Sequence, residues 1–193
     1  MAETQNQCPP CWENMMRTAQ CGNSRAGIKS IMFAEKSDVA TWPTKKPAET
    51  RTKLEDHVIT TTTDMEMKVG KKFYLFEAKK ATGELQYVIE GESGGRSLKA
   101  TLTVYYNQFG PNLHGFISAI KNKELAMLVK VGNNDWHLLG DEDEGVEIET
   151  FDAKTGKATT DAIGADITFS ISGLEGATIY KGDVEQLLLP SIA

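Results

Sequence analysis

SLKATLTVYY (residues 97–106) is one of two stretches that decide the fold class; the other is ADITFSISG (residues 165–173). In both stretches apolar and polar residues alternate with a period of two. This period places the apolar side chains on one face of a β-strand and the polar side chains on the other. A helix would instead repeat its apolar residues every three or four positions. Both stretches are therefore predicted to be strands with two chemically different faces.

Strand patterns recur along most of the chain, in segments that alternate in polarity or are rich in β-branched and aromatic residues. These segments are residues 26–34, 58–63, 72–77, 84–90, 97–106, 124–131, 136–139, 146–151, 165–173 and 177–180. The segment 111–123 differs, because its apolar residues are spaced as on one face of a helix. Many short strands and one helix predict a mainly β fold: an antiparallel β-sandwich or barrel with one short flanking α-helix.

Length and composition predict one domain with an arm. A chain of 193 residues, 40% hydrophobic and 25% charged, is typical of a globular protein with a single core. Residues 1–25 show no strand pattern, so we expect a partly ordered N-terminal arm there and a single domain over 26–193. Residues 35–56 contain two prolines and few apolar residues, which predicts a long exposed loop. Loops of about 20 residues inside a compact domain are often functional, so this loop is a candidate contact arm.

All three cysteines, Cys8, Cys11 and Cys21, lie in the predicted arm. Disulfides therefore cannot be the framework of the domain. The C-x-x-C spacing also fits a redox pair or part of a zinc site. A redox pair would need a preceding strand, and a zinc site would need a nearby fourth ligand, but the first histidine is His57. We favour reduced cysteines, and keep a metal clip and a redox pair as alternatives.

Two sequence patterns imitate the motifs of serine enzymes. GESGG (residues 91–95) matches the G-x-S-x-G nucleophile elbow, with Ser93 in the place of the nucleophile. An elbow leads directly into a helix, whereas a strand pattern follows here, so a glycine-rich hairpin turn is the preferred interpretation. SAIK (118–121) and KTG (154–156) match two of the three elements of penicillin-recognising enzymes. The third element, Ser-Asp-Asn, is absent, and KTG is more simply a turn between strands.

Metal and nucleotide motifs are also missing from the sequence. His57, His114 and His137 are far apart and form no metal-binding pattern, and no P-loop or dinucleotide fingerprint is present. The acidic run at 141–144 lacks the spacing of an EF-hand, so we interpret it as a solvated acidic hairpin. We therefore predict no enzyme, no catalytic, cofactor-binding or metal-binding residues, and no cofactor. A small β-barrel binding module, or a hydrolase that uses Ser93, is the alternative from a different class.

The charge of the chain bounds its partners. Acidic residues outnumber basic residues by 27 to 21, which gives a net charge of -6. This net negative charge disfavours a nucleic-acid-binding protein that contacts phosphate backbones with its whole surface. No apolar run approaches the roughly 20 residues that a membrane-spanning helix needs. The N-terminus has neither the basic start nor the apolar centre of a secretory signal, so we expect a protein made and kept in a cytoplasm.

The C-terminal half resembles the tail tube proteins of long-tailed bacteriophages. The residues that carry the resemblance are the hairpin 128–132 to 136–140, Thr155-Gly156, Asp161, Gly164, and the strand 167–169 leading to Gly173. The N-terminal residues 27–34 with Trp42-Pro43 resemble the opening of such virion proteins, and about half of the chain is covered. The resemblance implies a tail-tube-like sandwich flanked by a helix, in subunits that close into hexameric rings. These rings would stack into a tube through which DNA passes.

The function expected from this resemblance is a non-enzymatic virion structural protein, made in the bacterial host cytoplasm. Its partners would be copies of itself, other tail proteins of the virion, and passing DNA that is not bound by sequence; no membrane is involved. A sheet continued between neighbours leaves no free edge, and an acidic channel lining would repel phosphates. A capsid decoration protein or a head-tail connector protein is the alternative within the same class.

Overall fold

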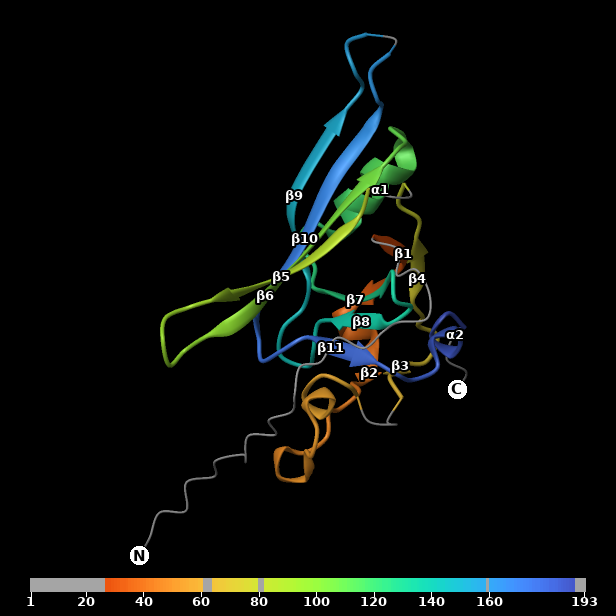
Figure 1. The fold of residues 1–193 in the computed structure, drawn as a ribbon. Coiled ribbons are helices and arrows are strands. Elements are labelled where there is room, and N and C mark those ends of the chain that lie inside the picture. The colour runs from red at the N-terminus through yellow and green to blue at the C-terminus, as the bar shows by residue number, and fades with distance from the viewer. Residues whose placement is uncertain (1–26, 61–63, 80–81, 159, 190–193) are drawn as a thin grey trace, which may run out of the picture.

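A computed structural model describes residues 27–60, 64–79, 82–158 and 160–189 (Figure 1). The strands are β1 (Ile28–Glu35), β2 (Val39–Thr41), β3 (Glu66–Met67), β4 (Tyr74–Phe76), β5 (Glu84–Glu90), β6 (Ser97–Tyr106), β7 (Leu125–Val131), β8 (Trp136–Leu139), β9 (Glu147–Lys154), β10 (Gly164–Leu174) and β11 (Thr178–Tyr180). The helices are α1 (Pro111–Ile120) and α2 (Val184–Leu187), with the 3-10 turns η1 (Lys36–Asp38), η2 (Ala48–Thr50) and η3 (Leu54–His57).

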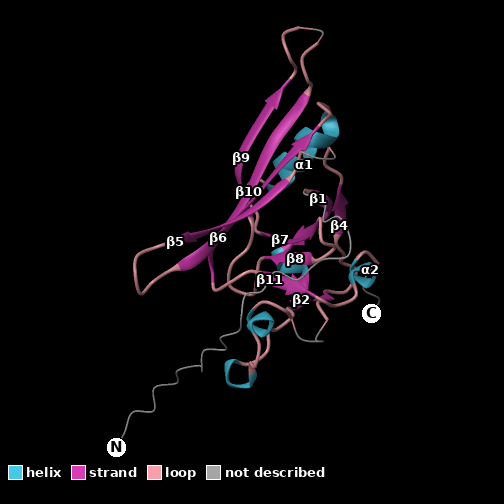
Figure 2. Ribbon diagram, in the orientation of Figure 1, coloured by secondary structure: helices cyan, strands magenta, loops and turns pink. Residues whose placement is uncertain are grey.

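The strands form two main antiparallel sheets and one small one (Figure 2). A five-stranded sheet has the order β11-β8-β7-β1-β4, and a four-stranded sheet has the order β5-β6-β10-β9. β2 and β3 pair as a two-stranded sheet. The predicted fold class is confirmed: the protein is mainly β, with antiparallel sheets packed as a sandwich and α1 beside it.

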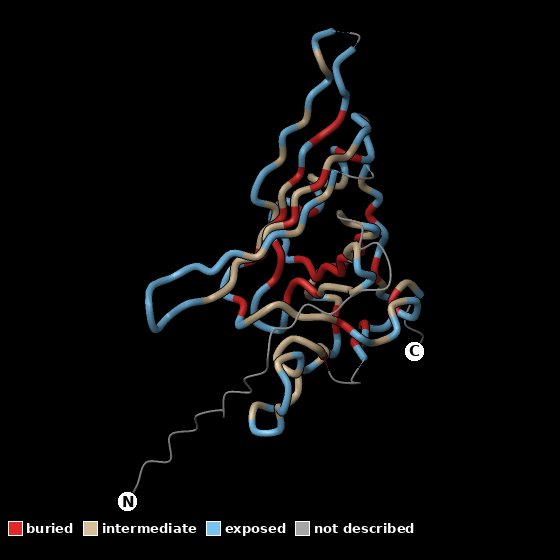
Figure 3. Tube along the Cα trace, viewed as in Figure 1, coloured by how far each residue is buried: buried red, intermediate tan, exposed pale blue. Residues whose placement is uncertain are grey.

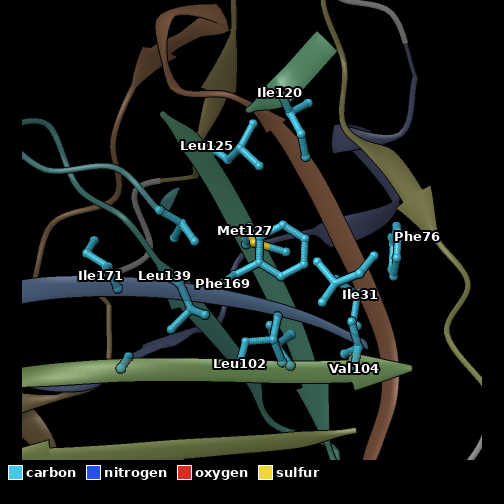
Figure 4. Packing of buried hydrophobic residues seen from close by; sticks show 14 of the residues in the cluster. Ile31, Phe76, Leu102, Val104, Ile120, Leu125, Met127, Leu139, Phe169 and Ile171 are labelled. Atoms are coloured by element: carbon cyan, nitrogen blue, oxygen red, sulfur yellow. The ribbon is translucent and has the colours of Figure 1, made fainter. Parts of the chain in front are cut away.

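The main core fills the space between the two large sheets (Figure 4). It is formed by the alternate residues of β6 and β10 that the sequence pattern assigns to one face, such as Leu102 and Phe169, which are 0% and 1% exposed. The five-stranded sheet contributes Ile31 and Met127 from the opposite side. Burying side chains of this size stabilises the fold by about 1.5–3 kcal/mol each. The core therefore joins the two sheets into one unit.

A second core covers the other face of the five-stranded sheet. There Met32 of β1 and Leu128 of β7 pack with Phe73, Tyr180 and Leu187. Because both faces of this sheet are covered, β7 is buried at five successive residues, LAMLV, and shows no alternation of polarity. The irregular segments between the strands form a third layer, which covers this face of the five-stranded sheet.

The segment predicted as a long loop, residues 35–56, contains η1, β2, η2 and the start of η3. Its side chain Trp42 packs against the second core. Near its end one carboxylate oxygen of Asp56 accepts hydrogen bonds from the backbone N–H groups of Thr52 (2.8 Å) and Lys53 (3.0 Å) and from Lys46 Nζ (3.1 Å). These donors, the Thr52 N–H first, lower the pKa of Asp56 to about 2. The carboxylate of Asp56 therefore holds residues 46–56 together by hydrogen bonds, and we call these residues the braced segment.

Other predicted elements differ in their extent. In the described part of the predicted strand 58–63, Ile59 and Thr60 form only single bridges; residues 61–63 lie outside the described residues. Ile59 bridges to Ile179 in parallel, so this segment runs along β11 at the edge of the five-stranded sheet. The helix predicted over 111–123 ends at Ile120, because the chain then turns directly into β7. The predicted arm, 1–25, lies outside the described residues.

Candidate functional site

The residues of the serine-enzyme motifs do not come together. Ser93 is exposed in the turn that joins β5 to β6, where Gly91 and Gly94 adopt positive φ angles of 92° and 99°. Ser118 is exposed on α1. The KTG residues 154–156 lie at the end of β9 and in the turn that follows it.

The three histidines lie in three different environments. The Nδ1 atom of His57 is 3.3 Å from Arg51 Nη1, and the His114 ring packs edge-on against Phe109. His137 lies on β8 and contacts Tyr87. Each histidine is therefore engaged by a neighbour other than Ser93.

Within the described ranges, no group of three or more His, Cys, Asp or Glu side chains is placed to hold a metal ion. The cysteines Cys8, Cys11 and Cys21 all lie outside these ranges. Among the same residues, no helix combines the length and apolar character needed to cross a bilayer.

The outer face of the four-stranded sheet is a polar surface formed by four ordered strands. The register of the strands places its side chains there: Glu84, Gln86, Val88 and Glu90 of β5; Ser97, Lys99, Thr101, Thr103 and Tyr105 of β6; Glu147, Glu149, Thr150, Asp152 and Lys154 of β9; Asp166, Thr168, Ser170 and Ser172 of β10. Hydroxyl groups form the centre of this face, and carboxylates outnumber amino groups on it. The face is therefore polar, acidic and exposed to solvent, while the inner face of the same strands is apolar.

One ion pair crosses this face. Lys99 Nζ on β6 lies 3.0 Å from Glu149 Oε1 on β9, with β10 between the two strands. The hydrogen bond to Glu149 raises the pKa of Lys99. Both side chains are partly exposed, and such pairs contribute only about 0–1 kcal/mol. The ion pair therefore orders the surface more than it stabilises the fold.

The two edges of the four-stranded sheet are formed by β5 and β9, each of which pairs with a single strand in the described part of the chain. Neither strand contains proline, which is one of the usual means of blocking an edge. Because every neighbouring pair in this sheet is antiparallel, β5 and β9 run in opposite directions. The β5–β6 and β9–β10 hairpins therefore extend from opposite ends of the sheet (Figures 1 and 3).

Tyr87 and His137 tie the two large sheets together beside the β5 edge. The Tyr87 hydroxyl and His137 Nδ1 are 3.0 Å apart, in a hydrogen bond between β5 and β8. Burial raises the pKa of Tyr87 and lowers the pKa of His137, so both groups are neutral near pH 7. A neutral pair of this kind stabilises the sandwich without carrying a charge into it.

Replacing Tyr87 by phenylalanine is expected to lower the free energy of unfolding by about 0.5–1.5 kcal/mol, since one partly buried hydrogen bond is lost.

Acid is expected to lower the free energy of unfolding of the wild-type protein, because it protonates His137. The pKa of His137 is lower in the folded state, so the unfolded state takes up a proton first as the pH falls below about 6.5. Urea unfolding at pH 7.5 and 5.5 measures this loss. The pH dependence should be smaller in His137→Gln, and an unchanged pH dependence would contradict the assignment.

The residues that carry the resemblance to tail tube proteins lie in the β7–β8 hairpin and in the β9–β10 hairpin with its turn. In the structure these hairpins belong to different sheets, one to the five-stranded and one to the four-stranded sheet. Comparisons of the chain with protein-family models, with curated proteins and with solved structures gave no match.

Proposed function

We propose that this chain is a non-enzymatic structural subunit of a virion, and that it assembles with copies of itself into stacked rings around a DNA channel, as a tail tube protein does. The observation that carries the proposal is the four-stranded sheet. One of its faces is apolar and packed, the other is polar and acidic, and both of its edges are strands without proline. Such a sheet has the properties of a wall segment between a protein layer and a water-filled channel.

The direction of the edge strands supports closure into a ring. When β9 of one copy lies beside β5 of the next, the two strands run antiparallel, so the hydrogen-bond ladder of the sheet continues across the junction. The contact is head-to-tail, because different surfaces meet, and repeated contacts of this type close into a ring when the rotation is suitable. Closure removes both exposed edges. A hexamer is the ring size that the resemblance implies.

The outer face of the sheet has the chemistry that a DNA channel needs. Carboxylates such as Glu84 and Asp166 repel the phosphates of passing DNA, whereas a basic lining would bind them by releasing counterions. Serine and threonine hydroxyls keep the wall hydrated. The braced segment 46–56, which extends from the second core (orange in Figure 1), is a further surface through which copies would meet.

Charge changes at Gln86 are expected to shift assembly in opposite directions. Gln86 lies on the outer face of β5, and the β9 strand of the neighbour would bring Glu147, Glu149 and Asp152 toward it. Gln86→Lys should favour the ring, and Gln86→Glu should disfavour it, by about 0.2–1 kcal/mol per junction. Sedimentation velocity at low salt measures the shift, which should shrink at high salt because ions screen exposed charges. Equal assembly of both variants at low salt would argue against a β5–β9 junction.

The experiment that tests the proposed function is size-exclusion chromatography of the purified protein followed by negative-stain electron microscopy. Stacked rings or tubes with a central channel are expected. Closed rings that never stack would favour a connector or decoration protein instead. A monomer at every concentration tested would count against self-assembly and would favour a binding module.

A further inference from the structure

Among the large apolar side chains that are exposed on the described part of the domain, two pairs are neighbours on a strand. In the β5–β6 hairpin Val88 is 43% exposed and Ile89 is 65% exposed. On β4, at the end of the five-stranded sheet, Tyr74 is 51% exposed and Leu75 is 63% exposed. Successive side chains of a strand point to opposite faces, so Ile89 and Leu75, the more exposed member of each pair, are the apolar groups that a second surface would cover.

The second of these places is a groove. Two hollows, of about 570 Å³ and 350 Å³, lie on either side of residues 75–79, which both hollows share as a wall. Phe33, Phe76 and Phe116 line the larger hollow, with ring centroids of Phe33 and Phe76 at 5.1 Å and 5.4 Å from that of Phe116. Ile28 and Ile31 line the smaller one. We call these two hollows together with β4 the β4 groove.

The hairpin of the same copy cannot fill the β4 groove. Gly83, which lines the smaller hollow, immediately precedes β5, so the hairpin begins beside the groove. β5 then runs for seven residues away from it, which carries the hairpin tip on the order of 20 Å from the groove. The tip and the groove can therefore meet only between two copies of the chain.

The charges around the two surfaces match. The hairpin tip carries the exposed carboxylates of Glu90 and Glu92 and the exposed guanidinium of Arg96. Lys29, Lys79 and Glu77 line the β4 groove; the ammonium group of Lys29 donates to Asn134 Oδ1, and that of Lys79 lies 5.4 Å from the Tyr105 ring centroid. The tip is thus mainly negative and the groove mainly positive, and each also has one group of the opposite sign that can pair with the other surface. Opposite charges around an apolar centre are typical of a specific contact.

We infer that the β5–β6 hairpin tip of one copy, residues 88–92, docks into the β4 groove of a second copy, and that this contact stacks the rings. The inference rests on the proposed function. The β5–β9 junction joins copies sideways, across the strands. The hairpin tip and the β4 groove instead lie near opposite ends of β5, so their contact joins copies along the strand direction. Two contacts in different directions are what a stack of rings requires.

Ile89→Asp tests the docking contact in the full-length protein. An aspartate at the centre of the contact should raise the protein concentration needed for tubes by on the order of tenfold or more, and should leave single rings. Leu75→Asp should have the same effect from the groove side. The matched control is Ile163→Asp, which places the same charge on an isoleucine that is 52% exposed near the tip of the other hairpin. All three residues are exposed, so thermal unfolding should confirm that each variant is folded.

The outcomes separate this inference from the proposed function. Tubes that persist unchanged in both Ile89→Asp and Leu75→Asp would overturn the docking contact and leave the ring proposal standing. A wild-type protein that forms open filaments, which Ile89→Asp abolishes, would support the docking contact and refute the closed ring. A wild-type protein that remains monomeric at all concentrations would refute both.

Discussion

Replacing Phe169 by alanine is expected to lower the free energy of unfolding by about 3–5 kcal/mol, because it removes a large side chain from the centre of the main core. Phe169 lies on β10, is 1% exposed, and meets the Phe76 ring edge-on at a centroid distance of 6.4 Å (Figure 4). Its neighbours come from both sheets, so the cavity cannot close without shifting one sheet toward the other. Chemical denaturation followed by tryptophan fluorescence measures the loss.

The matched control is Phe109→Ala, which removes the same side chain from a position that is 40% exposed. The control should cost less, because less apolar area leaves water at Phe109 than at Phe169 when the chain folds, and the exposed ring leaves no closed cavity behind. If the two variants lost equal stability, the main core would not be the structure that holds the sheets together. The comparison needs no assembly, so it tests the fold independently of the proposed function.

The sequence pattern predicts the sandwich because the strands of the four-stranded sheet have one solvent-exposed polar face and one buried apolar face. In β6, residues such as Lys99 and Leu102 alternate as the pleat requires, and the structure places them on opposite faces. The run LAMLV in β7 shows no alternation, because both faces of this strand are covered. The alternation of β6 and β10 therefore predicts which of their residues are buried, whereas the covering of β7 on both faces is known only from the structure.

The elements that escaped prediction depend on contacts distant in sequence. β2 and β3 are two or three residues long, and they become strands because they cover the second core. The four-residue helix α2 is ordered by the burial of Leu187. The threonine-rich segment after His57 has high strand propensity, yet in the described part it forms only single bridges. Propensity alone does not show where a partner strand is available.

The candidate site was predictable only in part. The polar face of β6 and β10 can be predicted from their alternation, so the polar character of the outer face of this sheet was accessible from sequence. Which strands form the edges was not, because strand order is a property of the whole fold. β9 comes late in the chain and β5 in its middle, yet they become the two ends of one sheet. Their opposite directions, on which the ring proposal depends, follow from that order.

Replacing Gly164 by alanine is expected to lower the free energy of unfolding by roughly 3 kcal/mol. Gly164 begins β10 at a φ of 156°, where side chains are disfavoured. A Cβ atom there would also collide with the backbone oxygen of Tyr106 and come within 2.6 Å of the Tyr105 hydroxyl oxygen. Because the backbone oxygen belongs to the paired strand β6, it cannot move away without opening the sheet where β10 leaves the turn of the β9–β10 hairpin.

Gly173, on the same strand, separates the two causes. Its φ is 81°, but a Cβ atom there would have no neighbour within 4 Å. Gly173→Ala should therefore cost only the roughly 1–2 kcal/mol of the backbone conformation, and the excess loss in Gly164→Ala measures the crowding against β6. Urea unfolding midpoints of the two variants give this difference. If both alanines cost the same, the close approach of Gly164 to Tyr105 and Tyr106 would have no energetic role, and the β9–β10 hairpin would have to be held by its backbone pairing alone.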